Sequence, residues 1–113
     1  MAPITEDQVE RVRALVASIP PGHVATYGDI AAAADLSSPR IVGWIMRTDS
    51  ADLPWHRVLG ASGRPAPHLA TRQLETLRSE GVAVHDGRVP LKSVRFDFGA
   101  LPPPLRSTTN LGG

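Results

Sequence analysis

Leu53-Pro54-Trp55-His56-Arg57-Val58-Leu59 sets three large side chains in a row, at positions 55, 56 and 57, between apolar residues. Pro54 disfavours helical backbone at the residue before it. Val58 and Leu59 can anchor the stretch in a hydrophobic core, which would leave the three side chains facing a cleft. A buried turn with a hydrogen-bonded histidine accounts for the same residues equally well. The remainder of the chain is needed to choose between a site and a simple turn.

The composition of the chain indicates one soluble globular domain. Its 113 residues are enough for a modest core but too few for two domains. Apolar residues make up 42% and charged residues 20%, as in ordinary soluble proteins. No apolar run approaches the ~18 residues of a transmembrane helix, and the start of the chain lacks the pattern of a signal peptide. We therefore expect no membrane partner.

The absence of cysteine restricts the possible chemistry. With no cysteine in its sequence, the chain can form no disulfide, no zinc–thiolate site and no thiol nucleophile. The four histidines, at positions 23, 56, 68 and 85, lack the spacing of metal ligands. We expect neither a metal ion nor another cofactor.

The charge is distributed unevenly along the chain. The formal net charge is only +1, which by itself argues against a nucleic-acid partner. Residues 1–39 carry two arginines and five acidic residues, whereas residues 40–113 carry ten basic and six acidic residues. The basic second part could therefore form a surface that faces phosphates.

Capping residues and apolar spacing predict a first and a last helix. Thr5-Glu6-Asp7-Gln8 reads as a capping box, and apolar residues recur at helical spacing from Val9 to Ile19. The break at Pro20-Pro21-Gly22 ends this helix. The last helix is expected over residues 69–80, with Gly81 as its C-cap.

Two short helices between the first and the last helix suggest a helix-turn-helix. Thr26 is a plausible N-cap for a helix that continues to Ala34. Ser37 or Ser38 can cap the next helix, since Pro39 then falls in the first turn, where proline is favoured. The tight turn between the two helices makes residues 39–47 the candidate recognition helix.

The two faces of this recognition helix differ in character. One face should pack inward, because it carries Val42, Ile45 and Met46. The opposite face carries Arg40, Gly43, Trp44 and Arg47. A glycine within a helix costs about 1 kcal/mol relative to alanine, so close approach of another surface is one explanation for it. A solvated arginine face with an incidental glycine is the other.

The opening stretch resembles the Pro-Cys-His-Arg-Val active-site motif of the alkylguanine-DNA alkyltransferases, with Trp55 in place of the nucleophilic cysteine. This replacement is the hallmark of the alkyltransferase-like proteins, which keep the damaged-base pocket and lose the transfer chemistry. Further similarity lies at residues 19–31, at Arg40-Ile41-Val42-Gly43 and at Leu77-Arg78-Ser79-Glu80-Gly81. The resemblance covers about residues 5–91, and it implies a homologue of the C-terminal domain of the alkyltransferases.

The resemblance implies a DNA-binding surface on the third helix. In the family this helix enters the minor groove, the arginine that matches Arg40 enters the duplex as a finger, and the tyrosine that matches Tyr27 contacts DNA. Ile41 and Trp44 are bulkier than the small residues common in the family at these positions. The DNA-binding residues that we expect are Tyr27, Arg40, Gly43, Trp44 and Arg47.

The resemblance also implies a pocket for alkylated guanine, with residues 60–68 as one wall. The residues that we expect to line it are Tyr27, Trp55, His56, Arg57, Ser62, Gly63, Arg64 and His68. Asp49 takes the place of the asparagine that braces the active-site turn in the family, and Glu80 that of the glutamate that faces the histidine. Both are expected to give structural support, and no residue is expected to be catalytic.

The expected fold is mainly α: a small helical domain with a winged-helix-like helix-turn-helix and a short C-terminal β-hairpin. The hairpin is predicted over residues 82–91, with its tight turn at Asp86-Gly87. Residues 1–98 form the expected DNA-binding domain. Residues 99–113 lack apolar periodicity and are expected to form a flexible tail.

The expected function is recognition of damaged DNA without catalysis. The indole of Trp55 is no useful nucleophile, but it is an apolar plate that can line a pocket for an alkyl group on guanine O6. We expect binding of O6-alkylguanine in duplex DNA and flipping of the damaged nucleotide without removal of the alkyl group. As in the family, the complex would mark the lesion for nucleotide excision repair, whose proteins are the expected partners.

We expect a monomer, placed in the bacterial cytoplasm at the nucleoid or in a eukaryotic nucleus. The alternative is a helix-turn-helix transcription regulator without lesion preference.

Overall fold

The computed structural model describes residues 4–100, which form a mainly helical domain. The elements in chain order are α1 (Glu6–Ser18), β1 (Ala25–Thr26), α2 (Tyr27–Ala33), α3 (Pro39–Thr48), the 3-10 turn η1 (Trp55–Arg57), β2 (Val58–Leu59), η2 (Pro67–Leu69), α4 (Ala70–Ser79), α5 (Leu91–Val94) and η3 (Phe98–Ala100). The expected mainly α fold class is confirmed. No helix among the described residues has both the length and the apolar content that a membrane span requires.

The helices begin where the sequence predicts. Thr5 and Gln8 form the expected capping box at the start of α1, because each side chain bonds the other residue's backbone N–H. Thr26 caps α2 in the same reciprocal way with Asp29. Of the two serines that could cap α3, the structure selects Ser38, with Pro39 at the first helical position.

A tight turn at Asp35 joins α2 to α3 and confirms the helix-turn-helix. Asp35 has a positive φ of 59°. Its backbone N–H donates to Ala32 O at 3.2 Å, and that of Leu36 donates to Ala31 O at 2.8 Å. These two bonds form a Schellman motif, which satisfies the last carbonyls of α2 and reverses the chain toward α3.

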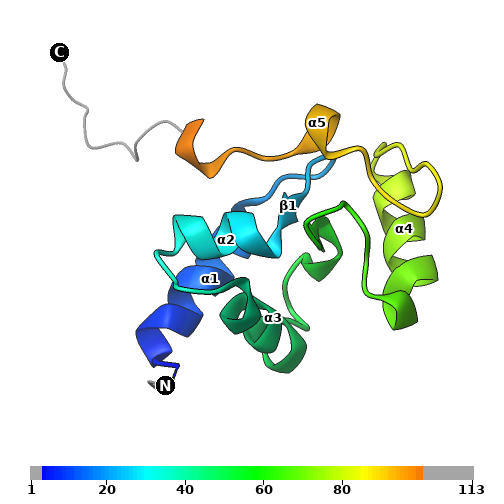
Figure 1. The fold of residues 1–113 in the computed structure, drawn as a ribbon. Helices are drawn as coiled ribbons and strands as arrows, with labels where there is room; N and C mark the ends of the chain where they lie inside the picture. The colour runs from blue at the N-terminus through cyan, green and yellow to red at the C-terminus, as the bar shows by residue number, and fades with distance from the viewer. Residues whose placement is uncertain (1–3, 101–113) are drawn as a thin grey trace, which may run out of the picture.

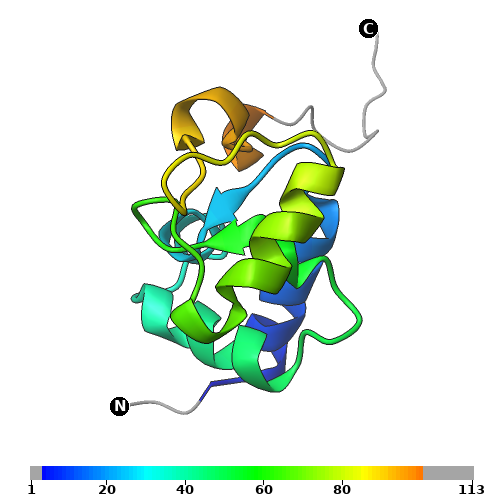
Figure 2. The same ribbon diagram turned by 90° about the vertical axis from the view of Figure 1, so that its right-hand side faces the viewer.

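Two short parallel strands, which the sequence analysis did not predict, hold the stretch at residues 53–59 in the centre of the molecule. β1 pairs with β2, so that Ala25 lies opposite Val58 and Thr26 opposite Leu59. Figure 2 shows the two strands side by side behind α4. Because successive strand residues face opposite sides, Val58 enters one hydrophobic cluster and Leu59 the other.

The core has two parts, one on each side of this strand pair. The first cluster joins α1, α2 and α3 through buried residues that include Val12, Val16, Ile30, Val42 and Ile45. The second joins the segment before β1 to α4 and the segment after it, through Val24, Leu59, Leu74, Leu77, Val82 and Val89. In Figure 1, α4 accordingly lies apart from the group of α1, α2 and α3.

The predicted C-terminal hairpin is shorter than expected. Its tight turn is present, since Asp86 and Gly87 both have positive φ, of 52° and 74°. A single antiparallel bridge, between His85 and Arg88, flanks the turn. The ladder goes no further because the next hydrogen-bonded pair would join residues 83 and 90, and Pro90 has no N–H to donate. The N–H of Val89 points away from the opposite arm and donates to Gly63 O at 2.9 Å.

The chain after this turn contains elements that were not predicted. α5 and η3 follow, and backbone hydrogen bonds join Val24 to Val94 and Phe96 beside β1. Residues 99 and 100, assigned to the expected tail, belong to η3. The rest of the expected tail, residues 101–113, lies outside the described residues.

Candidate nucleic-acid interface

The outer face of α3 presents the predicted combination of cations, an aromatic ring and a glycine. Val42, Ile45 and Met46 are buried, whereas Arg40 and Arg47 are exposed. Trp44 is 47% exposed, an unusual fraction for so large an apolar side chain. A Cβ added at Gly43 would meet no atom within 4 Å, so there is open space beside the helix backbone at this position. Within residues 4–100, neither arginine of this face forms an ion pair.

Tyr27 links this face to the core. It follows β1 directly and starts α2, and its half-buried ring packs against the first hydrophobic cluster, as does Trp55. Burial raises the pKa of the Tyr27 phenol, and the positive charge of Arg47 lowers it by less. The phenol is therefore neutral near pH 7, and it can donate a hydrogen bond to a phosphate beside α3.

The backbone turns sharply at Pro54, directly before the three large side chains of residues 55–57. Pro54 has φ −75° and ψ 63°, and the N–H of Trp55 donates to Leu53 O at 2.7 Å. This is the geometry of an inverse γ-turn. The 3-10 turn η1 follows and leads straight into β2, so that the strand pair fixes the position of residues 55–57.

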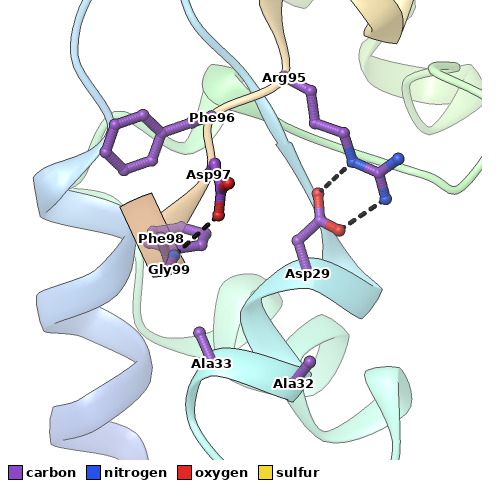
Figure 3. A pocket seen from close by; sticks show the side chains of 8 residues that line it. All are labelled: Asp29, Ala32, Ala33, Arg95, Phe96, Asp97, Phe98 and Gly99. Carbon is purple, nitrogen blue, oxygen red and sulfur yellow. Dashed lines mark hydrogen bonds and ion pairs between the residues drawn. The ribbon is translucent and has the colours of Figure 1, made fainter. Parts of the chain in front are cut away.

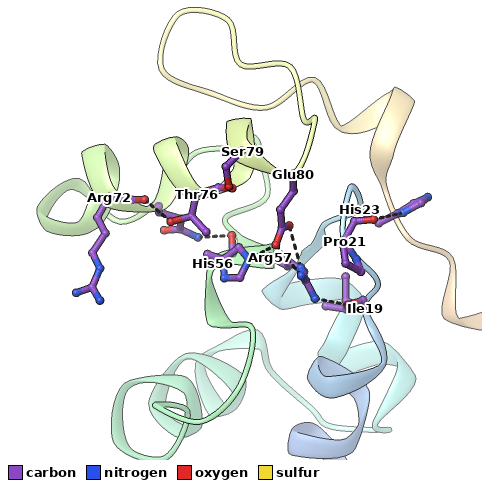
Figure 4. Close-up of polar contacts among 10 residues, drawn as sticks. Ile19, Pro21, His23, His56, Arg57, Arg72, Thr76, Ser79 and Glu80 are labelled. Atoms are coloured by element: carbon purple, nitrogen blue, oxygen red, sulfur yellow. Dashed lines mark hydrogen bonds and ion pairs between the residues drawn. The ribbon is translucent and has the colours of Figure 1, made fainter.

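Glu80 receives two of these three side chains (Figure 4). Its Oε2 lies 2.8 Å from His56 Nε2, which confirms the predicted contact between them. Arg57 Nη2 donates to the same oxygen at 2.6 Å, and Nε donates to Oε1 at 3.0 Å. The hydrogen bonds from Arg57, and then the contact with His56, outweigh burial and lower the pKa of Glu80 to about 2. The carboxylate is therefore ionised at neutral pH.

A helix end holds Glu80 in place. Glu80 is the C-cap of α4, and Gly81, with a φ of 90°, follows it. The N–H of Val82 donates to Leu77 O, and that of Gly81 to Arg78 O, both at 3.0 Å. This Schellman motif is the predicted glycine-dependent end of the helix.

Arg57, which is predicted to line the guanine pocket, has hydrogen-bond partners within the protein. Its Nη1 donates to Ile19 O at 2.9 Å, and its other two nitrogens bind Glu80. The side chain is 13% exposed. Arg57 therefore connects the end of α1 to the end of α4, because all three of its nitrogens already have protein acceptors.

Gln73 supports the same turn and lies outside the predicted site residues. It is buried, and its Nε2 donates to His56 O at 3.0 Å and to Val58 O at 2.8 Å. A signal was present: residue 73 lies on the same helical face as Leu74 and Leu77, and a polar residue on an apolar face usually has a hydrogen-bond partner.

Trp55 lies between the core and a cation. Its half-buried indole packs against the first hydrophobic cluster and meets the His56 ring edge-on, with centroids 6.2 Å apart. The guanidinium carbon of Arg72, from α4, lies 5.8 Å from the centroid of the Trp55 ring. Arg72 lies outside the predicted site residues.

The wall segment, residues 60–68, approaches the C-terminal turn. Gly63 is buried, and a Cβ added there would lie 2.2 Å from Val89 O. Gly63 therefore packs closely against the chain at Val89. A guanidinium nitrogen of Arg64 would lie 3.9 Å from a Cβ at Gly87, which places its side chain near the same turn. Ser62 and His68 are exposed.

Asp49 braces the chain through a partner that was not predicted. It is the C-cap of α3, and Arg13 of α1 donates to its carbonyl at 2.8 Å and to its carboxylate at 3.3 Å. Arg13 also binds Asp52, at 2.6 Å. The expected structural support therefore ties the loop before Trp55 to α1.

Two surface hollows lie away from Trp55. One lies between α2 and residues 95–99, where Arg95 binds Asp29 through two hydrogen bonds of 2.7 and 2.9 Å (Figure 3). Burial raises the pKa of Asp29, but the hydrogen bonds from Arg95 and Thr26 together lower it below its usual value. The other hollow is lined by Ser62 together with His85, Arg88 and Lys92. Only Ser62 belongs to the predicted site.

Comparison with known proteins points to one family. A family model described as 6-O-methylguanine DNA methyltransferase, DNA binding domain, matches residues 7–82. A DNA base-flipping protein of Escherichia coli (strain K12) is 39% identical over 98 residues, which cover 79% of this chain and 74% of that protein.

Solved structures agree with this similarity. The crystal structure of S. pombe Atl1 in complex with damaged DNA containing O6-carboxymethylguanine is similar with a TM-score of 0.75 and 28% identity, over 82% of this chain and 97% of that chain. The Mycobacterium tuberculosis O6-methylguanine methyltransferase is similar with a TM-score of 0.57 and 31% identity, over 67% of this chain and 48% of that chain.

Proposed function

The chain belongs to the O6-methylguanine DNA methyltransferase family, as an alkyltransferase-like protein without cysteine, and from this we propose that it recognises O6-alkylguanine in duplex DNA without removing the alkyl group. The observation that carries the proposal is Trp55, which stands where the resemblance places the nucleophilic cysteine. Around it, the contact of His56 with Glu80 is formed, although the chain has no thiol to ionise.

Nucleotide flipping would use the outer face of α3. Arg40 is exposed at the start of this helix and has donors for the partner base that flipping leaves unpaired. Gly43 allows the helix axis to approach a groove closely. Flipping costs a few kcal/mol, and less for a damaged, poorly paired base. This difference supplies part of the lesion preference before any pocket contact forms.

The lesion would then contact the indole of Trp55. An O6-alkyl group adds apolar surface to guanine, and an aromatic ring offers a matching apolar surface. Transfer of the alkyl group would need a nucleophile at this point, which indole does not supply. The expected product is a long-lived complex of protein and lesion.

A binding measurement separates this proposal from the helix-turn-helix regulator. Fluorescence anisotropy would compare two duplexes of identical sequence, one with O6-methylguanine and one with guanine, at a fixed salt concentration. A damage-recognition protein binds the methylated duplex more tightly. Equal affinities, combined with strong dependence on the surrounding sequence, would favour the regulator.

The consequence of binding that we propose is recruitment of nucleotide excision repair by a monomeric protein, at the bacterial nucleoid or in a eukaryotic nucleus. The proposal rests on the resemblance to the alkyltransferase-like proteins. Incision of an O6-methylguanine duplex by a reconstituted excision nuclease should become faster when the protein is added. An unchanged or slower incision rate would contradict this coupling.

A further inference from the structure

Arg72 lies against the ring of Trp55, and we infer that it makes this site selective for O6-alkyl groups that end in a carboxylate. The inference rests on the proposed function, because it concerns which lesions the site prefers. It names a specificity-determining residue that lies outside the expected pocket, on α4.

The guanidinium of Arg72 lies beside the indole of Trp55. Its guanidinium carbon lies 5.8 Å from the centroid of the Trp55 ring, within the ~6 Å range of cation–π contacts. The indole also packs on the first hydrophobic cluster and meets the His56 ring edge-on. An alkyl group that reaches Trp55 therefore arrives beside the guanidinium of Arg72.

The charge of Arg72 is available for a ligand. Among residues 4–100, no carboxylate lies within ion-pair distance of it. Glu80 is already bound by Arg57 and His56, and Figure 4 shows the guanidinium of Arg72 extending away from α4, apart from that cluster. The side chain is exposed. Its fork of N–H donors matches the two oxygens of a carboxylate.

Two lesions would use this arrangement differently. A methyl group gains contact with the indole but offers nothing to the cation beside it. A carboxymethyl group places its methylene on the same ring and can direct its carboxylate to Arg72. An exposed charge-assisted hydrogen bond is screened by water and salt, so the gain in affinity should be moderate.

A phosphate of the DNA backbone is the other anion that Arg72 could bind. Every duplex carries phosphates, so this contact would strengthen binding to damaged and undamaged DNA alike. Selectivity for a carboxylate therefore has to be measured as a ratio between lesions in one sequence.

The test uses three duplexes that differ at one base: guanine, O6-methylguanine and O6-carboxymethylguanine. We expect the wild-type protein to bind the carboxymethyl duplex about tenfold more tightly than the methyl duplex, a difference of about 1.4 kcal/mol. Arg72→Gln should bring this ratio close to one and retain the preference for O6-methylguanine over guanine. Arg72→Lys, which keeps the charge without the fork, should give an intermediate ratio.

Arg78→Gln is the matched control, because Arg78 is an exposed arginine of the same helix that forms no ion pair within residues 4–100. It should leave the ratio unchanged. The inference is overturned if Arg72→Gln keeps the wild-type ratio of affinities. It is also overturned if the variant lowers the affinity for all three duplexes equally, as loss of a phosphate contact would. If the wild-type protein prefers neither lesion over guanine, the proposed function fails together with the inference.

Discussion

Glu80 Oε2 lies 2.8 Å from His56 Nε2, in a chain that has no thiol for such a pair to activate. Glu80 also binds Arg57, whose third nitrogen holds Ile19 O at the end of α1. The carboxylate thus connects α4 to the turn that carries Trp55 and, through Arg57, to the first helix.

The first prediction concerns the pH dependence of this contact. The pKa of Glu80 is lowered from its usual 4.5 to about 2. A carboxylate with a lowered folded-state pKa contributes stability that is fully present above pH 5 and is lost as the pH falls toward 2. We expect Glu80→Gln to lower the free energy of unfolding by about 3 kcal/mol at pH 7, because Arg57 loses its largely buried charged partner.

Urea unfolding of wild type and Glu80→Gln, followed by circular dichroism between pH 7 and pH 2, measures this contribution. The difference between the two proteins should shrink as the pH falls from 5 to 2. Glu75→Gln, at an exposed position of the same helix, is the control and should track the wild type. A difference that stays constant over this range would contradict the assignment of the low pKa to Glu80.

The second prediction contrasts two glycines. Gly63→Ala should lower the free energy of unfolding by about 2 kcal/mol or more, because its Cβ would lie 2.2 Å from Val89 O and its φ is 81°. Gly43→Ala should raise it by about 0.5–1 kcal/mol, because the new methyl group meets no atom and alanine favours the helix.

DNA affinity should separate the functional glycine from the structural one. If α3 approaches a groove at Gly43, then Gly43→Ala weakens binding to DNA even though it stabilises the fold. Thermal unfolding and anisotropy on the same sample check both quantities. Gly43→Ala with unchanged affinity would show that this point of α3 does not approach the DNA.

Local signals in the sequence were sufficient to predict the helices. Thr5, Thr26 and Ser38 each satisfy an N–H within three residues, so the caps that start α1, α2 and α3 are independent of the rest of the fold. The faces of α3 are likewise a local property, because helical spacing alone separates Val42 from Arg40. The contact between His56 and Glu80 came from the resemblance, since nothing local relates residues 24 positions apart.

The strand pair could not be predicted in this way. Each strand has two residues, too few to show alternation, and its partner lies 33 positions away in the chain. The contacts of Arg57, Gln73 and Arg72 could not be predicted either. Each joins segments that are far apart in the sequence, and they become neighbours only in the folded structure, where α4 lies beside the turn that carries Trp55. The predicted hairpin was too long because Pro90, which has no N–H, falls where the next hydrogen-bonded pair of the ladder would form.

The third prediction concerns Arg40. Arg40→Ala should weaken binding to the O6-methylguanine duplex by at least about tenfold and lower the preference over the undamaged duplex, since the side chain would fill the space left by the flipped base. Arg88→Ala, on the C-terminal turn, is the control. If both variants lower the affinity for damaged and undamaged DNA by the same factor, Arg40 is an ordinary phosphate contact.

The fourth prediction concerns Trp55. Trp55→Ala should remain folded and should reduce the preference for the methylated duplex by more than the ~0.8 kcal/mol of one buried CH₂ group, because a large aromatic surface is lost. Anisotropy with both duplexes measures the ratio, and circular dichroism confirms the fold. An unchanged ratio would make the indole a core residue without a role in recognition.

Trp55→Cys recreates Pro-Cys-His-Arg-Val beside Glu80. We expect this variant to bind damaged DNA but to show little or no alkyl transfer. Asp49, in place of the family's asparagine, accepts hydrogen bonds from Arg13 of α1, so the network that braces the family's active-site turn differs here. Efficient transfer would show that the cysteine alone was missing.

The most direct test of recognition without catalysis follows the alkyl group itself. A duplex with radiolabelled O6-methylguanine is incubated with excess wild-type protein, and protein and DNA are then separated under denaturing conditions. We predict that the label remains entirely on the DNA, although the same amount of protein retards that duplex, in preference to the undamaged one, in a native gel. Label on the protein, or its release into solution, would contradict the claim that this chain recognises the lesion without removing it.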